Sequence, residues 1–430
     1  MVPEPGNPNG SQPGGNPPGP VPAGMGYHGR EAPDNAPRPG SSRAGRFFAR
    51  APAFTRARGA GRPFSATAPW SCPHGLCTAA LVWRAGIGGS PGQRPGEEGI
   101  VGMADRQALD ILGIGNAIVD VVASATDATL AEWGMAKGGM ALVDTDRATA
   151  IHAAVGEGVQ TGGGSAANTC AAAAALGAKV GYLGKVAEDA PGKAFAEDLK
   201  KLGIHFPTKP LKGGAPTARC LILVTPDGQR TMNTYLGACV AFGEEDVDQG
   251  AVESAAVTYL EGYLYDPPAA QAAFRRAAGI AHGAGRQVAI TLSDSFCVGR
   301  HRQAFHDFIA RDADIVFTNE DEALSLFGVV DAEAATRAFA ATGKLVALTR
   351  SEKGSRIISP NGDVIEVPAV STTLIDSTGA GDAYAAGFLA AHARGLPLAE
   401  CGRWGSVAAA EVISHFGARP QAELRRLVGV

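Results

Sequence analysis

From about residue 108 onward, short apolar runs alternate with segments of helical period, and this alternation constrains the fold more than any other feature. Such runs predict strands of a largely parallel sheet, because the connection between two parallel strands usually passes through a helix. We therefore expect an α/β fold in which helices surround one sheet. The expected strands are 109–115, 256–264, 287–293, 313–319 and 344–350, and the expected helices are 165–177, 193–203, 269–284, 301–311, 320–327, 332–341, 380–394, 403–416 and 420–428.

One region interrupts this rhythm. Residues 217–236 have the pattern of two strands joined by a turn at Pro226-Asp227-Gly228, and short strands near 119–124 and 140–143 could pair with this hairpin. A small sheet outside the main one would form a lid. We treat 103–430 as one domain whose lid comprises roughly 117–145 and 205–240.

The first 102 residues have a different composition, dominated by Pro, Gly, Ala and Arg without a sustained apolar period. Such a segment buries too little surface to offset its chain entropy, so we expect a disordered extension, or an over-extended start that precedes a true first residue at Met103. Ten arginines and five acids give it a formal charge of +5, which leaves −9 for the remainder. The acidic remainder argues against a nucleic-acid partner. An organellar transit peptide is the alternative, although so much Pro and Gly would break its amphipathic helix.

Cysteine usage and hydropathy indicate a cytoplasmic protein. The seven cysteines are scattered and odd in number, so no disulfide framework is implied. Cys72 and Cys77 enclose His74, but no second ligand pair follows, and we expect no metal site there. No apolar run reaches the eighteen or so residues that a membrane span needs, so we expect no membrane partner.

The stretch "DSTGAGDAYAAGFL" predicts a helix that begins at three small residues, Gly379, Ala380 and Gly381. Backbone N–H groups at a helix start lack partners and can hold an anion, which small residues allow to approach closely. Asp382 beside that anion makes chemical sense if it accepts a proton from an attacking hydroxyl. The stretch thus indicates phosphoryl transfer to an alcohol; the alternative is a Gly-rich turn with an acidic first helical turn.

"GIGNAIVD" resembles the start of a dinucleotide fingerprint, but Ile118 stands where the third glycine belongs. Asn116 and Asp120 remain, four apart in an extended segment, so both side chains lie on one face and could bind vicinal hydroxyls. A turn-forming Asn and a solvated Asp are the alternative.

"TGGGSAANTC" (161–170) places Gly163 and Gly164 before a helix whose N-terminus can face a ligand. Ser165 would cap this helix, and Asn168 on its first turn would point the same way. A flexible loop before an Ala-rich core helix is the alternative.

A nucleotide site is indicated by the ends of two later strands. Asn319 and Glu322 could hold waters around Mg²⁺, or form an ordinary helix cap. Thr349 and Gly354 are plausible contacts for nucleotide phosphates. No Gly-x-x-x-x-Gly-Lys-Ser/Thr motif occurs, which excludes a P-loop.

In this order, these motifs resemble the PfkB family of carbohydrate kinases, also called the ribokinase family, over residues 103–430. "DSTGAGDAYAAGFL" is close to the C-terminal signature of that family, "GGGSAANTC" with "GKVAEDAPG" resembles its glycine motif, and "NEDE" resembles its Asn-x-x-Glu magnesium motif. The resemblance implies a ribokinase-like three-layer α/β/α sandwich with a small β-sheet lid, and ATP and Mg²⁺ as cofactors.

"GNAIVD", "PTARCLILVTPDGQRTM", "EGYL" and "LSDSFCVGRHRQAF" are more similar to the adenosine kinase branch, which would place the chain in purine salvage. This similarity implies that Asp120 binds the ribose 2′ and 3′ hydroxyls and that Asp382 takes the 5′-hydroxyl proton. The implied substrate-binding residues are Asn116, Asp120, Gly163, Gly164, Asn168 and Arg230.

For the phosphates, the resemblance implies that the amides of Gly379, Ala380 and Gly381 hold the developing charge and that Arg230 on the lid reaches the same groups. The implied ATP-binding residues are Asn319, Thr349, Gly354 and Gly381, with Glu322 on Mg²⁺ through water. The loop around Asp376 and Thr378 could support activation by a monovalent cation such as K⁺.

Two departures leave the acceptor open. Leu264 follows Tyr263 where animal adenosine kinases place an aromatic residue, and Ser406 replaces a histidine of some relatives. Inosine, guanosine, cytidine, ribose or fructose are alternative acceptors, and a non-catalytic nucleoside-binding relative is a third hypothesis. The sequence fits a monomer or a homodimer.

Overall fold

The computed structural model describes residues 108–430 with the exception of residue 157, all within one compact unit, Arg94–Val430. The predictions about residues 1–102, including Cys72 and Cys77, lie outside the described residues.

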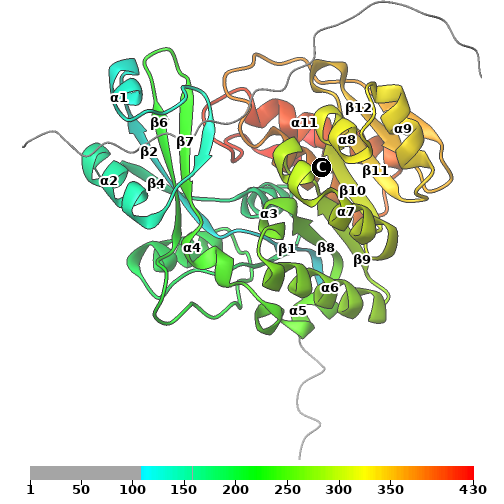
Figure 1. Ribbon diagram of the computed structural model, residues 1–430. Helices are drawn as coiled ribbons and strands as arrows, with labels where there is room; N and C mark the ends of the chain where they lie inside the picture. The colour runs from blue at the N-terminus through cyan, green and yellow to red at the C-terminus, as the bar shows by residue number, and fades with distance from the viewer. Residues whose placement is uncertain (1–107, 157) are drawn as a thin grey trace, which may run out of the picture. The chain divides into compact units, whose positions relative to one another are not determined.

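The main sheet has eight strands in the order β13-β12-β11-β10-β9-β8-β1-β5 (Figure 1). The six from β11 to β5 are parallel, and β12 and β13 add an antiparallel edge. All five predicted strands are confirmed, while β5, β12 and β13 were not predicted. The bounds are β1 Leu109–Ile114, β5 Val180–Leu183, β8 Ala255–Glu261, β9 Gln287–Thr291, β10 Ile315–Asn319, β11 Leu345–Thr349, β12 Ser355–Ile358 and β13 Val364–Val367.

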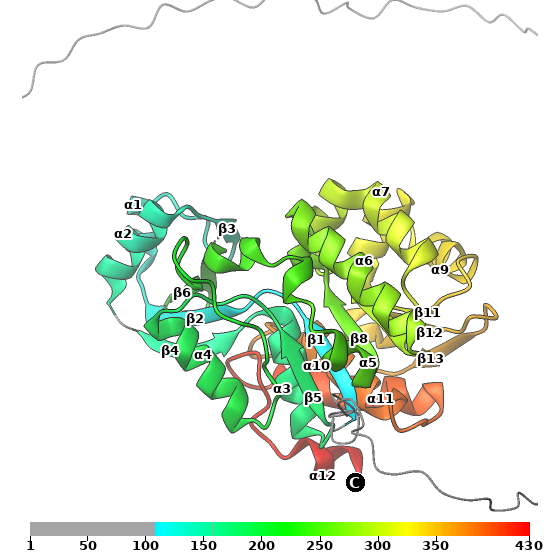
Figure 2. The ribbon, with the colours of Figure 1, turned by 90° about the horizontal axis from the view of Figure 1, so that it is seen from below.

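Alternate side chains of the central strands enter two separate cores, because successive residues of a strand point to opposite faces. On β8, Val257 and Tyr259 join one core and Leu260 joins the other. Helices therefore cover both faces, with α6, α7 and α9 above the sheet and α11 and α12 below it in Figure 2. One face carries α3 (Ser165–Ala175), α4 (Ala190–Lys201), α10 (Ala380–His392), α11 (Leu398–Val412) and α12 (Leu424–Val428), and the other carries α5 (Gln249–Ser254), α6 (Pro268–Gly283), α7 (Ser295–Arg311), α8 (Glu320–Phe327) and α9 (Ala332–Ala340).

Several predicted boundaries were wrong. The strand expected to run to residue 264 ends at Glu261 and is followed by a 3₁₀ turn, Gly262–Tyr265. Helix α7 begins at Ser295, where Asp294 caps it, and only His301 inside it departs from helical geometry. Within the described part of the chain, no helix has both the length and the apolar character of a membrane span.

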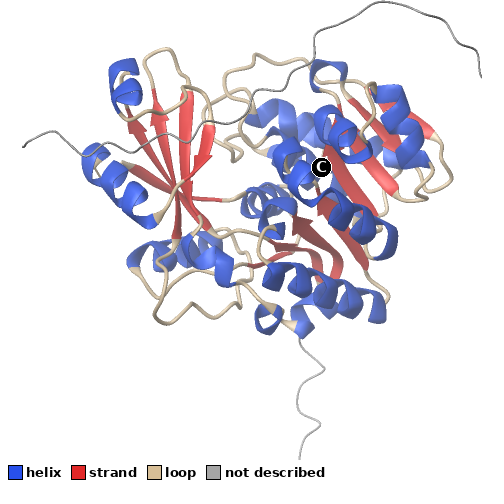
Figure 3. Cartoon of the chain, viewed as in Figure 1, coloured by secondary structure: helices blue, strands red, loops and turns tan. Residues whose placement is uncertain are grey.

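The second sheet, which we call the lid, has five strands in the order β3-β7-β6-β2-β4. Figure 3 shows this sheet beside the main one, on the left. The predicted hairpin is present as antiparallel β6 and β7, and β2 pairs with β6 and β4. Strand β4, which contains Gly162 and Gly163, was not predicted, and neither were helices α1 and α2. The bounds are β2 Ile118–Ser124, α1 Asp127–Glu132, β3 Met140–Leu142, α2 Thr145–Val155, β4 Val159–Gly163, β6 Ala218–Val224 and β7 Arg230–Tyr235.

Candidate active site

Asp382 lies in the first turn of α10, next to the first turn of α3. Ser165 Oγ donates a hydrogen bond of 2.6 Å to Asp382 Oδ1, and Asn168 Nδ2 lies 3.4 Å from Oδ2. Burial raises the pKa of Asp382 to about 6, although both of these hydrogen bonds favour the charged form. A carboxylate with this pKa is mostly ionised at neutral pH and is a better proton acceptor than an ordinary aspartate.

The start of α10 has the features of an anion site. Gly379 is the N-cap, with φ of 78°, and no side chain caps the helix. The Ala380 amide donates to the Ser377 carbonyl at 3.2 Å, whereas no described residue accepts from the amides of Gly379 and Gly381. These amides are therefore available to a ligand.

Asp120 on β2 faces Gly163 of the neighbouring strand β4. A Cβ on Gly163 would lie closer than 3.0 Å to the Asp120 carboxylate, so only glycine fits there without a shift. Burial raises the pKa of Asp120 to about 7, against the positive charges of Arg419 and Arg230, and the charge of Asp382 raises it further. The structure thus brings Asp120, Gly163 and Asp382 to one site.

The structure adds Glu261, at the end of β8, which was not predicted as a site residue. Its Oε1 accepts from Asn116 Nδ2 at 2.7 Å and its Oε2 accepts from the Ala166 amide at 2.8 Å. Burial raises the pKa of Glu261 to about 7, although these hydrogen bonds oppose the rise. An acid that ends the otherwise apolar run "AVTYLE" was the available signal.

Arg230 extends from lid strand β7 to the loop before α10. Its Nη1 forms an ion pair of 2.7 Å with Asp376 Oδ2 and lies 3.5 Å from Thr378 Oγ1. Although burial opposes it, hydrogen bonds from Thr378 and Gly417 and the charge of Arg230 lower the pKa of Asp376. A contact of Arg230 with phosphates stays a prediction.

The sequence analysis predicted Arg230 as a cation of the site but missed a second cation, Arg419. It pairs with Asp198 on α4, and its Nε lies 3.4 Å from Asn168 Oδ1. Because a guanidinium only donates, this contact turns the Asn168 amide nitrogen toward Asp382.

The structure places Asn319 and Glu322 in a reciprocal capping box at the start of α8, which is the alternative interpretation of this motif. The Asn319 side chain accepts from the Glu322 amide at 2.9 Å, and Glu322 accepts from the Asn319 amide at 3.0 Å. Burial raises the pKa of Glu322 to about 7, and the charges of Asp294 and Asp321 contribute in the same direction. No group of three or more His, Cys, Asp or Glu side chains that could hold a metal directly is found in residues 108–430 other than 157.

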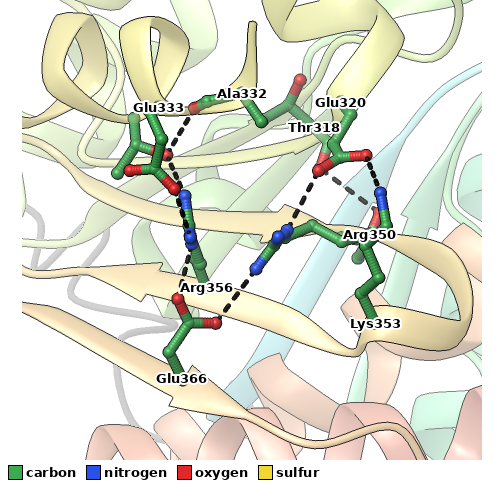
Figure 4. Close-up of polar contacts among 10 residues, drawn as sticks. Thr318, Glu320, Ala332, Glu333, Arg350, Lys353, Arg356 and Glu366 are labelled. Atoms are coloured by element: carbon green, nitrogen blue, oxygen red, sulfur yellow. Dashed lines mark hydrogen bonds and ion pairs between the residues drawn. The ribbon is translucent and has the colours of Figure 1, made fainter.

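Thr349 and Gly354 flank the turn between β11 and β12, and Thr349 pairs in register with Asn319 on β10. An ion-pair network supports this turn (Figure 4): Arg350 contacts Glu320 at 3.0 Å and Glu366 at 3.1 Å. Thr349 and Gly354 thus lie at the ends of two adjacent strands, β11 and β12.

The two positions that departed from the expected pattern are both buried. Leu264 is 1% exposed and belongs to the core on the α5–α9 face, and Ser406 lies buried on α11. Tyr263, which precedes Leu264, donates from its hydroxyl to the Ser293 carbonyl at 3.2 Å. The Leu264 side chain is therefore a core residue here.

Comparison with known proteins gives a family match over most of the described chain. Residues 136–424 match the model of the pfkB family carbohydrate kinases. A cytidine kinase of Thermococcus kodakarensis is 31% identical over 275 residues, which are 61% of this chain and 91% of that protein. An ATP-dependent ribose-1-phosphate kinase of Halopiger xanaduensis is 30% identical over 233 residues, 54% of this chain and 73% of that protein.

Solved structures include similar chains at higher identity. The adenosine kinase from Sinorhizobium meliloti is 48% identical with a TM-score of 0.70, over 74% of this chain and 98% of that one. A probable sugar kinase from Rhizobium etli is 44% identical with a TM-score of 0.70, over 75% of this chain and 98% of that one. The adenosine kinase from Schistosoma mansoni in complex with 2-fluoroadenosine is 23% identical with a TM-score of 0.65, over 74% of this chain and 99% of that one. At this identity the similarity shows the shared fold alone.

Proposed function

The chain belongs to the pfkB family of carbohydrate kinases, and on this basis we propose that it transfers the γ-phosphoryl group of ATP to the 5′-hydroxyl of adenosine. It is a phosphotransferase with a ribokinase-like fold. The observation that carries the proposal is the Asp382 carboxylate, held by Ser165 beside the amides of Gly379 and Gly381, which donate to no described residue.

In the proposed reaction Asp382 accepts the proton of the attacking hydroxyl, and the helix start stabilises charge on the transferred group. The raised pKa of Asp382, about 6, suits this role because proton transfer is efficient when the pKa lies near the working pH. The new bond forms between the acceptor oxygen and the γ-phosphorus as the bond from phosphorus to the β–γ bridging oxygen breaks. ADP leaves with that oxygen.

The proposed acceptor contacts are Asp120 and Asn116, with Gly163, Gly164 and Asn168 around them. Asp120 in ionised form accepts hydrogen bonds only, which suits a pair of ribose hydroxyls. The 48% identity to a chain named as an adenosine kinase supports adenosine over other nucleosides. This assignment would place the enzyme in purine salvage in the cytoplasm.

We propose that Mg²⁺ accompanies ATP and is held through water by Glu322. Glu322 fits this role because its carboxylate is buried beside Asp294 and Asp321, whose charges favour a nearby cation. Mg²⁺ would neutralise phosphate charge when bound. For ATP itself the proposed contacts are Asn319, Thr349, Gly354 and Gly381, and a monovalent cation such as K⁺ would act at the loop of Asp376 and Thr378.

A second candidate acceptor class is supported by the curated relatives, which include a cytidine kinase, a ribose-1-phosphate kinase and a protein named nucleoside kinase. Another nucleoside or a sugar would use the same Asp382 chemistry and differ only in contacts beyond the reacting hydroxyl. A non-catalytic role would leave the Asp382 geometry without a purpose.

The test is ADP release with Mg-ATP and a panel of adenosine, inosine, guanosine, cytidine, ribose, ribose 1-phosphate and fructose, with product identification. We expect AMP from adenosine as the main product. A higher kcat/KM for a sugar would overturn the acceptor but keep the chemistry, whereas nucleoside binding without any ADP would overturn both.

A further inference from the structure

Glu261 is a buried carboxylate whose two oxygens serve two different elements of the site. The side chain is 1% exposed, and no ion pair of Glu261 is found in the described part of the chain. Burying a charge without a counter-ion is costly, so its two hydrogen bonds, to Asn116 and to the Ala166 amide, must compensate. Because burying the Glu261 charge costs folding free energy, we looked for a role of this side chain in the site.

The chain around Glu261 is shaped to admit it. A Cβ on Gly115 would lie closer than 3.0 Å to Glu261 Oε2, so this glycine of "GIGNAIVD" makes room for the carboxylate. The N-cap of α3 is Gly164, which offers no side-chain cap, and Glu261 caps the Ala166 amide from another strand instead. The same helical turn carries Ser165, which holds Asp382.

The consequence for Asn116 follows from hydrogen-bond chemistry. In its ionised form the Glu261 carboxylate accepts only, so the Asn116 amide then turns its Nδ2 toward Glu261, which leaves Oδ1 as the free atom. Among the described residues, the side-chain hydrogen bond found for Asn116 is the one from Nδ2 to Glu261. We propose that Glu261 is a positioning residue that fixes the hydrogen-bond polarity of the acceptor site, so that Asn116 presents an acceptor oxygen to a substrate hydroxyl. This rests on the proposed function, in which Asn116 contacts the acceptor.

Single substitutions at either position should reverse or spoil this polarity. In Glu261→Gln the side-chain oxygen must face the Ala166 amide, so the side-chain nitrogen faces Asn116 and forces its amide to flip. The flipped Asn116 would present a donor where the acceptor hydroxyl needs an oxygen. In Asn116→Asp two carboxylates would face each other and repel. Each single variant should bind the acceptor about tenfold more weakly, as for one lost hydrogen bond to a buried partner.

The double variant, Glu261→Gln with Asn116→Asp, provides the decisive comparison. The new amide can donate to the new carboxylate, which keeps one free oxygen toward the substrate and restores the original polarity. We expect acceptor binding by calorimetry, without ATP, to return to within about threefold of wild type. The KM for ATP should be the same in all four proteins, and thermal unfolding should show that each is folded.

Two results would overturn the proposal: wild-type acceptor binding in Glu261→Gln, or a double variant as weak as the product of the two single losses. A purely structural role of Glu261 would lower stability and weaken ATP and acceptor alike, without recovery. Wild-type turnover of a sugar or cytidine in place of adenosine would overturn the proposed acceptor alone. The four proteins would then be compared with that acceptor.

Discussion

Two groups of carboxylates in this molecule have opposite electrostatics. Around the acceptor site, Glu261 is buried and Asp120 and Asp382 are half-buried, and none of the three forms an ion pair with a described residue. Loss of hydration raises the pKa values of Asp120, Glu261 and Asp382 to about 7, 7 and 6. Glu320 on the β11–β13 side is paired with Arg350, and this pairing lowers its pKa although burial opposes the change. Glu366 and Glu333 there are likewise paired with Arg350 and Arg356 (Figure 4).

The difference distinguishes carboxylates that serve the proposed reaction from carboxylates that stabilise the fold. Unpaired buried carboxylates disfavour the folded state at neutral pH, and they are retained where a proton acceptor or a hydrogen-bond acceptor is needed. Paired carboxylates at a turn fix backbone geometry. Substitutions of the acceptor-site carboxylates should therefore change catalysis more than stability. Substitutions of the arginine-paired carboxylates should change stability more than catalysis.

The largest effect should come from Asp382→Asn. Without a proton acceptor, we expect turnover to fall on the order of 10³-fold while nucleoside binding stays within a few-fold of wild type. The matched control is Asp363→Asn on the exposed β12–β13 turn, which should leave turnover unchanged. Turnover of Asp382→Asn within tenfold of wild type would contradict the assigned base.

The same variant should be at least as stable as wild type. An acid whose pKa is raised by folding holds its proton at a pH where the unfolded chain releases it, so its contribution to stability falls as pH rises from about 4 through about 6. Asp382→Asn removes this effect. Its melting temperature relative to wild type should be higher at pH 8 than at pH 5; the opposite trend would contradict the raised pKa.

The next effect should come from Gly163→Ala. The added Cβ would collide with the Asp120 carboxylate, and we expect the KM of the acceptor to rise about 10- to 100-fold. Gly279→Ala on α6 is the matched control, because a Cβ there meets nothing within 4 Å and Ala favours a helix. Equal acceptor KM values in the two variants would show that Asp120 does not line the acceptor site.

A smaller effect concerns pH. As pH falls from 8 to 5, Asp120, Glu261 and Asp382 all take up protons, so kcat/KM for the acceptor should fall, with a slope steeper than tenfold per unit below about pH 6. The measurement is kcat/KM in a constant ionic-strength buffer series. A flat profile down to pH 5 would contradict the account.

The smallest catalytic effect should come from Arg356→Ala in the β11–β13 network. Arg356 bridges Glu333 and Glu366, two partly exposed partners, so its loss should lower the free energy of unfolding by about 1 kcal/mol. Turnover and both KM values should not change. Denaturant unfolding and steady-state kinetics together check this prediction. A large loss of turnover would show that the paired carboxylates also affect catalysis, which would contradict the distinction between the two groups.

The sequence predicted what depends on local pattern. The five buried strands and the start of α10 at Ala380 follow from apolar runs and from small residues at a helix start. Strand β4 was missed because two of the five residues in "VQTGG" are glycines, which are depleted in strands, and β5 was missed because four residues carry little periodicity. Their pairing with β2 and β1 is what stabilises them.

The site contacts that were missed depend on residues far apart in the chain. Asn116 and Glu261 are 145 positions apart, and Arg419 and Asn168 are 251 apart. An acid at a strand end gives no local sign of its partner, and the Arg230 pair with Asp376 depends on how the lid meets the main sheet. Composition and periodicity do not encode such distances.

The most direct test of the central claim is a competition in which the wild-type enzyme receives equal concentrations of adenosine and cytidine with Mg-ATP. The initial ratio of AMP to CMP equals the ratio of the two kcat/KM values. The account predicts an excess of AMP of at least about tenfold, as one selective contact can supply. A ratio near one, or an excess of CMP, would contradict the adenosine assignment.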